Sequence, residues 1–256
     1  MSKHSLTGLK ILIAVPTYKR AGNVPTLALF EPEDVFMFVD TQELDLYRKE
    51  HPEAKIVEYK GDKGLTPKLN AILDYARANK YDAIFKVDDD FEEMAYFAEG
   101  FTQRISDKGR IYQVIERMAV MARDAGSPLF VTLGIPDIRK YKRSEPFSLF
   151  GTLKIGAYGL LIDNDLRFDE RFLMKQDIDM CLQVLLHYRF YITENRYSFY
   201  YRPTMGNKGG VASYRTREKE IKMMEMLRKK WGQMAFTNAT SDRVSIYTLN
   251  IQNPFK

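Results

Sequence analysis

The chain has 256 residues, of which 45% are hydrophobic and 29% charged, as expected for a globular protein with a sizeable core. Its one cysteine, Cys181, excludes an internal disulfide and cysteine-rich metal sites, and no stretch approaches the roughly 20 apolar residues that span a bilayer. The net charge of +5 permits a polyanionic partner but does not require one.

The apolar run Leu9–Val15 near the start of the chain is too short for a signal peptide and runs directly into Pro16. The single cysteine is typical of a protein in a reducing compartment. We therefore expect a cytoplasmic protein without a membrane partner, and the sequence indicates no obligate protein partner.

The first 90 residues alternate apolar strands with an amphipathic helix. We expect strands at Lys10–Val15, Val35–Val39, Lys55–Tyr59 and Tyr81–Val87 and a helix at Thr66–Asn79. This order predicts a parallel, doubly wound half. Ligands of such sheets bind at the carboxyl ends of the strands, where Lys19, Asp40 and Asp88–Asp90 fall.

The rest of the chain is less regular. We expect a helix within Gly109–Gly126, strands at Leu129–Leu133 and Ala157–Ile162, and helices at Asp177–Tyr188 and Ser213–Trp231. The predicted fold is α/β, with a doubly wound mixed sheet and helices on both faces. No repeat or linker interrupts the pattern, so we expect one domain over residues 1–231 and a C-terminal extension over residues 232–256 that packs on it.

The acidic triplet Asp88-Asp89-Asp90 follows the last strand of the first half. Three adjacent carboxylates repel one another unless a cation lies among them. Mn²⁺ or Mg²⁺ held by Asp90, with Asp88 acting through a nucleotide or a water, would remove that repulsion, because both ions prefer carboxylate and phosphate oxygens. The alternative is a solvated acidic turn that caps a helix beginning at residues 91–93.

Five segments in the right order resemble the GT-A family-2 glycosyltransferases, and the match covers Leu9 to Phe190. The segments are Val15–Arg20, Gly64–Asn70, Val87–Asp90, Phe168–Phe172 and Gln176–Leu182. This resemblance implies a GT-A fold and metal-dependent transfer of a sugar from a UDP-sugar to a hydroxyl acceptor.

The resemblance also assigns roles to single residues. It implies that the donor is bound by Pro16, Thr17 and Arg20 in the nucleotide pocket, Asp40 at the uracil or ribose, Lys68 at the ribose or diphosphate, and Asp88 and Asp89 at the nucleotide-sugar. Asp88 and Asp90 would hold the metal. Asp177 would be the base of an inverting displacement.

Helical geometry distinguishes Asp177 from Asp179, because residues two apart on a helix point to nearly opposite sides. Asp177 stands at the expected N-terminus, where the helix dipole favours a carboxylate, although it could simply cap the helix. Gln176 stands where the family has glutamate. The family's late histidine ligand has no clear counterpart, since His187 lies on the same helix, so Asn207 is the alternative ligand.

The segment Met205–Val211 is rich in glycine and is a candidate lid, with Lys208 and Arg215 placed to neutralise phosphate. A plain glycine turn is the alternative. Asn207–Gly210 before a basic helix also resembles the TET-associated glycosyltransferases, which are largely phage-encoded. That resemblance implies a location in the host cytoplasm and an acceptor in DNA, a 5-hydroxymethylpyrimidine such as hydroxymethylcytosine.

Two stretches could contact DNA. The first contains the four cations Arg139, Lys140, Lys142 and Arg143, which could also be a solvated loop. The second, Arg196–Arg202, could instead be a strand whose Phe199 and Tyr201 pack in the core. Three other functions remain open: transfer to a protein, small molecule or surface glycan, a nucleotidyltransferase, and an inactive binding module.

Overall fold

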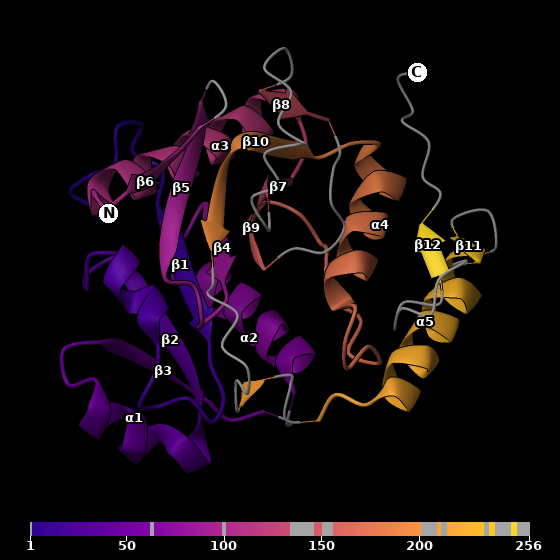
Figure 1. Ribbon diagram of the computed structural model, residues 1–256, viewed down its shortest axis with the longest axis horizontal. Coiled ribbons are helices and arrows are strands. Elements are labelled where there is room, and N and C mark those ends of the chain that lie inside the picture. The colour runs from indigo at the N-terminus through magenta and orange to yellow at the C-terminus, as the bar shows by residue number, and fades with distance from the viewer. Residues whose placement is uncertain are drawn as a thin grey trace.

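The computed structural model describes residues 2–61, 64–98, 101–133, 146–149, 156–200, 209–210, 214–232, 236–238 and 247–249 (Figure 1). The helices are α1 (Leu44–Glu50), α2 (Leu65–Ala78), α3 (Lys108–Ala125), α4 (Gln176–Tyr188) and α5 (Arg217–Trp231), with short 3-10 helices at Pro25–Leu29 and Thr41–Glu43. The strands are β1 (Ile11–Pro16), β2 (Val35–Asp40), β3 (Lys55–Tyr59), β4 (Ala83–Val87), β5 (Glu93–Ala98), β6 (Phe101–Ile105), β7 (Leu129–Leu133), β8 (Phe147–Ser148), β9 (Ala157–Leu161), β10 (Ile192–Tyr200), β11 (Phe236–Asn238) and β12 (Tyr247–Leu249).

Within the described residues one large sheet has the strand order β3-β2-β1-β4-β9-β7-β10-β5-β6, with β8 beside β10. Strands β1 to β4 pair in parallel, which confirms the doubly wound half. β9 runs antiparallel to both β4 and β7, so the sheet is mixed as predicted. β11 and β12 pair only with each other among the described strands, and the predicted domain division stays a prediction.

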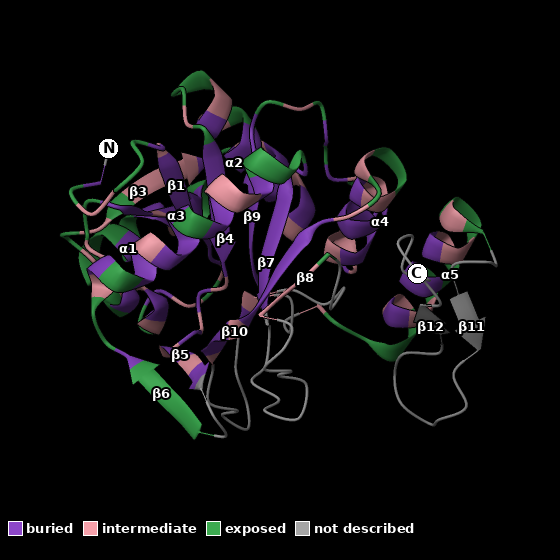
Figure 2. Cartoon of the chain, turned by 90° about the horizontal axis from the view of Figure 1, so that it is seen from above, coloured by how far each residue is buried: buried purple, intermediate pink, exposed green. Residues whose placement is uncertain are grey.

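Alternating side chains of β1 bury the two faces of the sheet in different cores. Ile11, Ile13 and Val15 pack in the cluster that contains the apolar face of α3. Leu12 and Ala14 pack in the cluster that contains α2 and α4. Helices therefore cover both faces, which explains why β1 is a continuous apolar run. In Figure 2 the central strands are buried, whereas the edge strand β6 is exposed.

Three features of the fold differ from the sequence-based expectations. The triplet is not the cap of a helix, because Glu93 begins β5, which pairs with β10 and buries Met94 and Phe97. α5 begins later than expected, at Arg217, because the Thr216 hydroxyl accepts a hydrogen bond from the Lys219 amide and caps it there. α1 and β6 were not predicted.

Glu194 on β10 is a fully buried carboxylate between two arginines. Arg117 of α3 lies 2.9 Å from Oε2, and Arg196 lies 2.8 Å from the same oxygen. The buried face of β10 also includes Phe199, as the core alternative predicted, whereas Tyr201 lies outside the described residues. The Glu194 carboxylate therefore ties α3 to the sheet.

We expect Glu194→Gln to lower the free energy of unfolding by about 2 kcal/mol, because it leaves two cations without their buried counter-charge. The expected loss of stability is smaller than for a fully buried ion pair, because the Arg117 side chain is 41% exposed. Urea denaturation measures it. The control is Glu93→Gln, whose partner Arg104 is 64% exposed and whose cost should stay below about 1 kcal/mol. Equal losses in the two variants would contradict the assignment.

Candidate active site

The loop after β1 and the acidic triplet after β4 are joined by hydrogen bonds. β1 and β4 are neighbours and parallel, so their carboxyl ends lie at the same edge of the sheet. The Thr17 hydroxyl donates to Asp89 Oδ2 at 2.7 Å. Arg20 Nη1 reaches Asp89 Oδ1 at 2.7 Å and Asp90 Oδ2 at 2.9 Å. The structure thus brings Thr17 and Arg20 beside the triplet.

Two further contacts fix this edge, and sequence reasoning missed both. Tyr47 of α1 is fully buried, and its hydroxyl lies 2.8 Å from Thr17 Oγ1 and accepts the Arg20 amide at 2.9 Å. Burial raises the pKa of Tyr47 to about 12, so the phenol stays protonated. The Thr26 hydroxyl donates to the Asp88 carbonyl at 2.6 Å and accepts the Phe91 amide at 2.9 Å, which holds the backbone on either side of the triplet.

Asp40 and Lys68 form a buried ion pair. Asp40 ends β2, and Lys68 lies in the first turns of α2. Lys68 Nζ lies 2.5 Å from Asp40 Oδ2 and donates to the Thr17 carbonyl at 2.7 Å. Burial lowers the pKa of Lys68, and the hydrogen bond and charge of Asp40 oppose that effect. The pair connects β2, α2 and the loop after β1 at one point.

Lys86, two residues before the triplet on β4, was not identified from the sequence. It is 3% exposed, its Nζ pairs with Asp88 Oδ1, and it donates to the Gly156 carbonyl at 3.1 Å. The pattern of a buried strand gave no sign of a charged side chain with a polar partner. Lys86 and Arg20 supply positive charge to the triplet, so the repulsion among its carboxylates does not by itself require a metal ion.

Two carboxylates of the triplet could hold a divalent ion. The Asp88 and Asp90 side chains are 39% and 28% exposed, whereas Asp89 is 9% exposed. The described residues contain no group of three or more His, Cys, Asp or Glu side chains placed to hold a metal. Mg²⁺ commonly binds through one or two carboxylates with phosphate oxygens and water completing its shell. Asp88 and Asp90 fit that arrangement.

Asp89 has a different environment from its neighbours. Its pKa is raised to about 6, mainly by burial and further by the charges of Asp88 and Asp90. The Arg20 charge and the Thr17 hydrogen bond oppose this rise. Both of its carboxylate oxygens are taken by Thr17 and Arg20. Asp89 therefore orients the loop after β1 from beneath the site.

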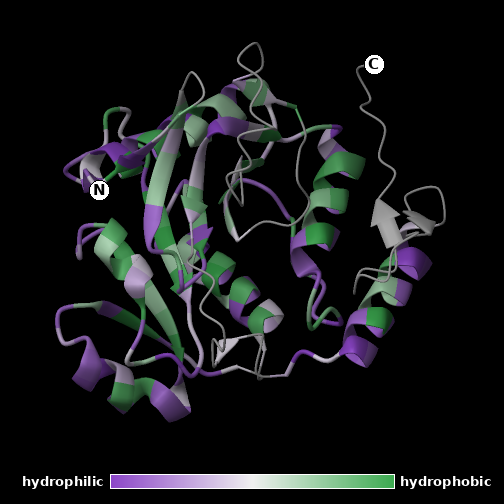
Figure 3. Cartoon of the chain, viewed as in Figure 1, coloured by the Kyte–Doolittle hydropathy of each residue, from purple (hydrophilic) through white to green (hydrophobic). Residues whose placement is uncertain are grey.

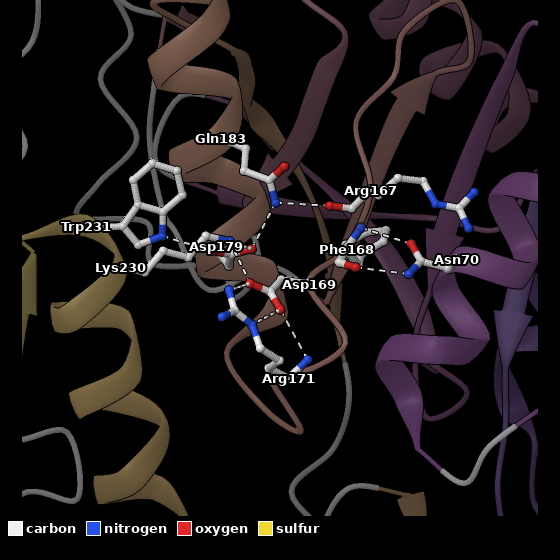
Figure 4. Close-up of polar contacts among 9 residues, drawn as sticks. All are labelled: Asn70, Arg167, Phe168, Asp169, Arg171, Asp179, Gln183, Lys230 and Trp231. Atoms are coloured by element: carbon white, nitrogen blue, oxygen red, sulfur yellow. Dashed lines mark hydrogen bonds and ion pairs between the residues drawn. The ribbon is translucent and has the colours of Figure 1, made fainter.

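Asp179 is buried on the side of α4 that faces α5 (Figure 4). It is 0% exposed, and its carboxylate accepts Gln183 Nε2 at 2.9 Å and Trp231 Nε1 at 2.9 Å. Lys230 Nζ lies 2.8 Å from Asp179 Oδ1. Figure 3 shows the first turn of α4 as hydrophilic and its later turns as mostly hydrophobic. The carboxylate of Asp179 is thus committed to the contact between the two helices.

Asp177 lies on the other side of α4, as the helical spacing predicted. It is half-buried and stands four residues before Cys181, which is fully buried against the sheet. Burial and the Asp177 charge raise the pKa of the Cys181 thiol. Burial, Asp177 and Asp88 raise the pKa of Tyr158 on β9 in the same way. Asp177 therefore faces the part of the sheet that leads to the triplet.

The described part of the glycine-rich segment contacts the loop after β1. The Gly210 amide donates to the Tyr18 carbonyl at 2.8 Å. Gly209 has a φ of +102°, and a Cβ there would lie 2.6 Å from the Lys19 carbonyl oxygen, so only glycine fits. Arg215 pairs with Glu220 of α5 at 2.5 Å, and Lys175 pairs with the same carboxylate at 2.8 Å, so the role of Arg215 at phosphate stays a prediction.

Several residues singled out from the sequence lie outside the described residues. They are Asn207 and Lys208 of the glycine-rich segment and the predicted DNA-binding residues Arg139, Lys140, Lys142 and Arg143. In the part of the chain that the structure describes, none of the helices combines the length and apolar character needed to cross a membrane. The expected cytoplasmic location stays a prediction.

Comparison with known proteins places this site in context. The family model described as TET-Associated Glycosyltransferase matches residues 11–210. The S. aureus TarS fragment 1–349 in complex with UDP-GlcNAc is similar in structure, with a TM-score of 0.50, 14% identity, and coverage of 86% of this chain and 67% of that chain. The same fragment with UDP gives a TM-score of 0.46, 14% identity, and coverage of 87% and 72%. No curated protein sequence matches the chain.

Proposed function

Since the chain belongs to the TET-associated glycosyltransferase family and is a glycosyltransferase with a GT-A fold, we propose that it transfers a sugar from a UDP-sugar at the β1–β4 edge of its sheet. One observation carries this proposal: Thr17, Arg20 and the triplet are hydrogen-bonded to one another at that edge. The similarity of the fold to TarS, which binds UDP-GlcNAc, supports UDP as the nucleotide.

The donor would lie over the loop after β1. Arg20 and Lys68 supply the positive charge that a diphosphate needs, and Asp40 can accept a hydrogen bond from uracil or ribose once Lys68 turns toward phosphate. Asp88 and Asp90 would hold Mg²⁺ or Mn²⁺ against the diphosphate. When bound, such an ion neutralises the charge that develops on the departing diphosphate.

The acceptor hydroxyl would approach from the side of α4. Asp177 is the described carboxylate of α4 that faces the sheet, because Asp179 is held by α5. A base in this position takes the proton of the acceptor hydroxyl as its oxygen forms a bond to the anomeric carbon and the bond from that carbon to the diphosphate breaks. Attack from the face opposite the leaving group inverts the anomeric configuration.

For the acceptor we propose a 5-hydroxymethylpyrimidine in DNA, on the strength of the family. The chain would be incubated with DNA containing hydroxymethylcytosine and a panel of UDP-sugars, and the nucleosides analysed by mass spectrometry. We expect a new nucleoside heavier by one sugar residue with a single donor. UDP-sugar hydrolysis without a new nucleoside would move the acceptor to a protein, small molecule or glycan. No UDP binding and no hydrolysis would favour an inactive binding module.

Removing the metal-binding carboxylate should abolish most of the transfer. We expect Asp90→Asn to lower kcat about 100-fold, since it weakens the binding of the metal ion that would neutralise the departing diphosphate. Activity of the unchanged protein should be lost on treatment with EDTA and restored by Mn²⁺ or Mg²⁺. The control is Asp163→Asn, an exposed carboxylate that follows β9 at the opposite end of the sheet. Full activity in EDTA would contradict the metal dependence.

A further inference from the structure

Tyr158 is a buried polar side chain that the proposed reaction does not yet use. It lies on β9, is 1% exposed, and its hydroxyl has no hydrogen-bond partner among the residues that the structure describes. A buried hydroxyl without a partner destabilises a fold, so such a group calls for a reason. Tyr112 of α3 is also buried, in the core cluster on the opposite face of the sheet.

Strand pairing places Tyr158 beside the triplet. In the antiparallel pairing of β4 with β9, Lys86 lies opposite Tyr158. Two residues further along the same pair of strands, the Asp88 amide donates to the Gly156 carbonyl at 3.2 Å. Lys86 Nζ lies 5.6 Å from the centre of the Tyr158 ring and also pairs with Asp88. The ring therefore stands over the cation that neutralises Asp88.

Helix α4 brings Asp177 to the same face of the sheet as Tyr158. Tyr158 and Cys181 belong to one core cluster, and Asp177 shares the face of α4 that carries Cys181. Asp177 and Asp88 are the two charged groups that raise the pKa of Tyr158 further after burial has raised it. The Tyr158 ring thus packs in the cluster that includes the Asp177 face of α4, and it also lies over the cation that pairs with Asp88.

We infer that Tyr158 is a positioning residue for Asp177: its hydroxyl donates a hydrogen bond to the Asp177 carboxylate when both substrates are bound. This role rests on the proposed function of Asp177 as the base. The hydroxyl is closed to solvent, so its partner is a group already beside it. A protonated phenol can donate to one carboxylate oxygen and leave the other directed at the acceptor hydroxyl.

The test is Tyr158→Phe, which removes only the hydroxyl. We expect kcat to fall about tenfold, since a hydrogen bond to a charged group is lost. The KM for the UDP-sugar that supports transfer to hydroxymethylcytosine DNA, and the affinity for UDP, should not change. The melting temperature should stay the same or rise, because an unpartnered buried hydroxyl has been removed. The matched control is Tyr112→Phe, which removes the hydroxyl of a buried tyrosine on the opposite face of the sheet and should leave kcat unchanged.

A double-variant cycle with Asp177→Asn separates the possible failures. If Tyr158 acts through Asp177, then adding Tyr158→Phe to Asp177→Asn lowers kcat no further. An unchanged kcat in Tyr158→Phe would overturn this inference and leave the base assignment intact. A raised KM for the donor at constant kcat would also overturn it, because it would show that Tyr158 contacts the sugar. Transfer retained by Asp177→Asn would instead overturn the base, and with it the inference.

Discussion

Asp177→Asn is expected to lower the rate of sugar transfer by about 1000-fold, since a positioned general base contributes roughly 10²–10⁴-fold to such reactions. The amide keeps the size of the side chain but cannot take the proton of the acceptor hydroxyl. UDP affinity should remain unchanged, because the donor contacts come from the ends of β1, β2 and β4. Calorimetry with UDP and single-turnover transfer measure the two quantities separately.

The outcome that contradicts this assignment is transfer at more than a tenth of the original rate. The control for a general effect on the fold is the melting temperature, which should change little since Asp177 is half-buried and asparagine keeps the size of the side chain. A variant that binds UDP, keeps its melting temperature and no longer transfers sugar is the pattern expected of a lost base.

Asp179→Ala should have the opposite pattern, a large loss of stability. Asp179 accepts hydrogen bonds from Trp231 and Gln183 and pairs with Lys230 in a fully buried position. Removing a buried ion-pair partner typically costs about 3–5 kcal/mol, and the 27% exposure of Lys230 places this case near 3 kcal/mol. We expect the melting temperature to fall by roughly 6–12 °C.

The contact with α5 provides the control for Asp179. Asp169 pairs with the same lysine at 2.9 Å, but its other partner, Arg171, is 72% exposed. Asp169→Asn should therefore cost less than about 1 kcal/mol. In a double-mutant cycle, Asp179→Ala and Trp231→Phe should couple, because the indole donates to the carboxylate. Independent effects of the two substitutions would show that the hydrogen bond contributes nothing to stability.

The parallel half of the fold was predictable because its signal is local. β1, β2 and β4 are short runs of apolar residues, and α2 repeats its apolar residues at helical spacing. α1 is too short for such a repeat, since it has seven residues and buries only Leu44 and Tyr47. β5 and β6 form a hairpin whose edge strand β6 is mostly exposed, so its sequence carries no periodic apolar pattern.

The separation of Asp177 from Asp179 also followed from the sequence, because the helical period is fixed by backbone geometry. The surroundings of charged side chains did not follow. Arg215 was predicted to neutralise phosphate, and nothing in the sequence indicated that it pairs with the buried Glu220, five residues later on α5, beside Lys175. Ion pairs between distant segments depend on packing, which a linear pattern does not encode.

For the acidic triplet, the sequence determined the position and the tertiary structure determined the surroundings. The sequence determines that the triplet follows a buried strand, because hydrophobic runs specify strands. The direction of the strand then places the triplet at the ligand-binding edge of a parallel sheet. Only the tertiary structure decided what each carboxylate meets. The loop after β1 brings Arg20 to Asp89 and Asp90, and the burial of Lys86 between neighbouring strands leaves its ammonium group to pair with Asp88, because a buried charge needs a partner.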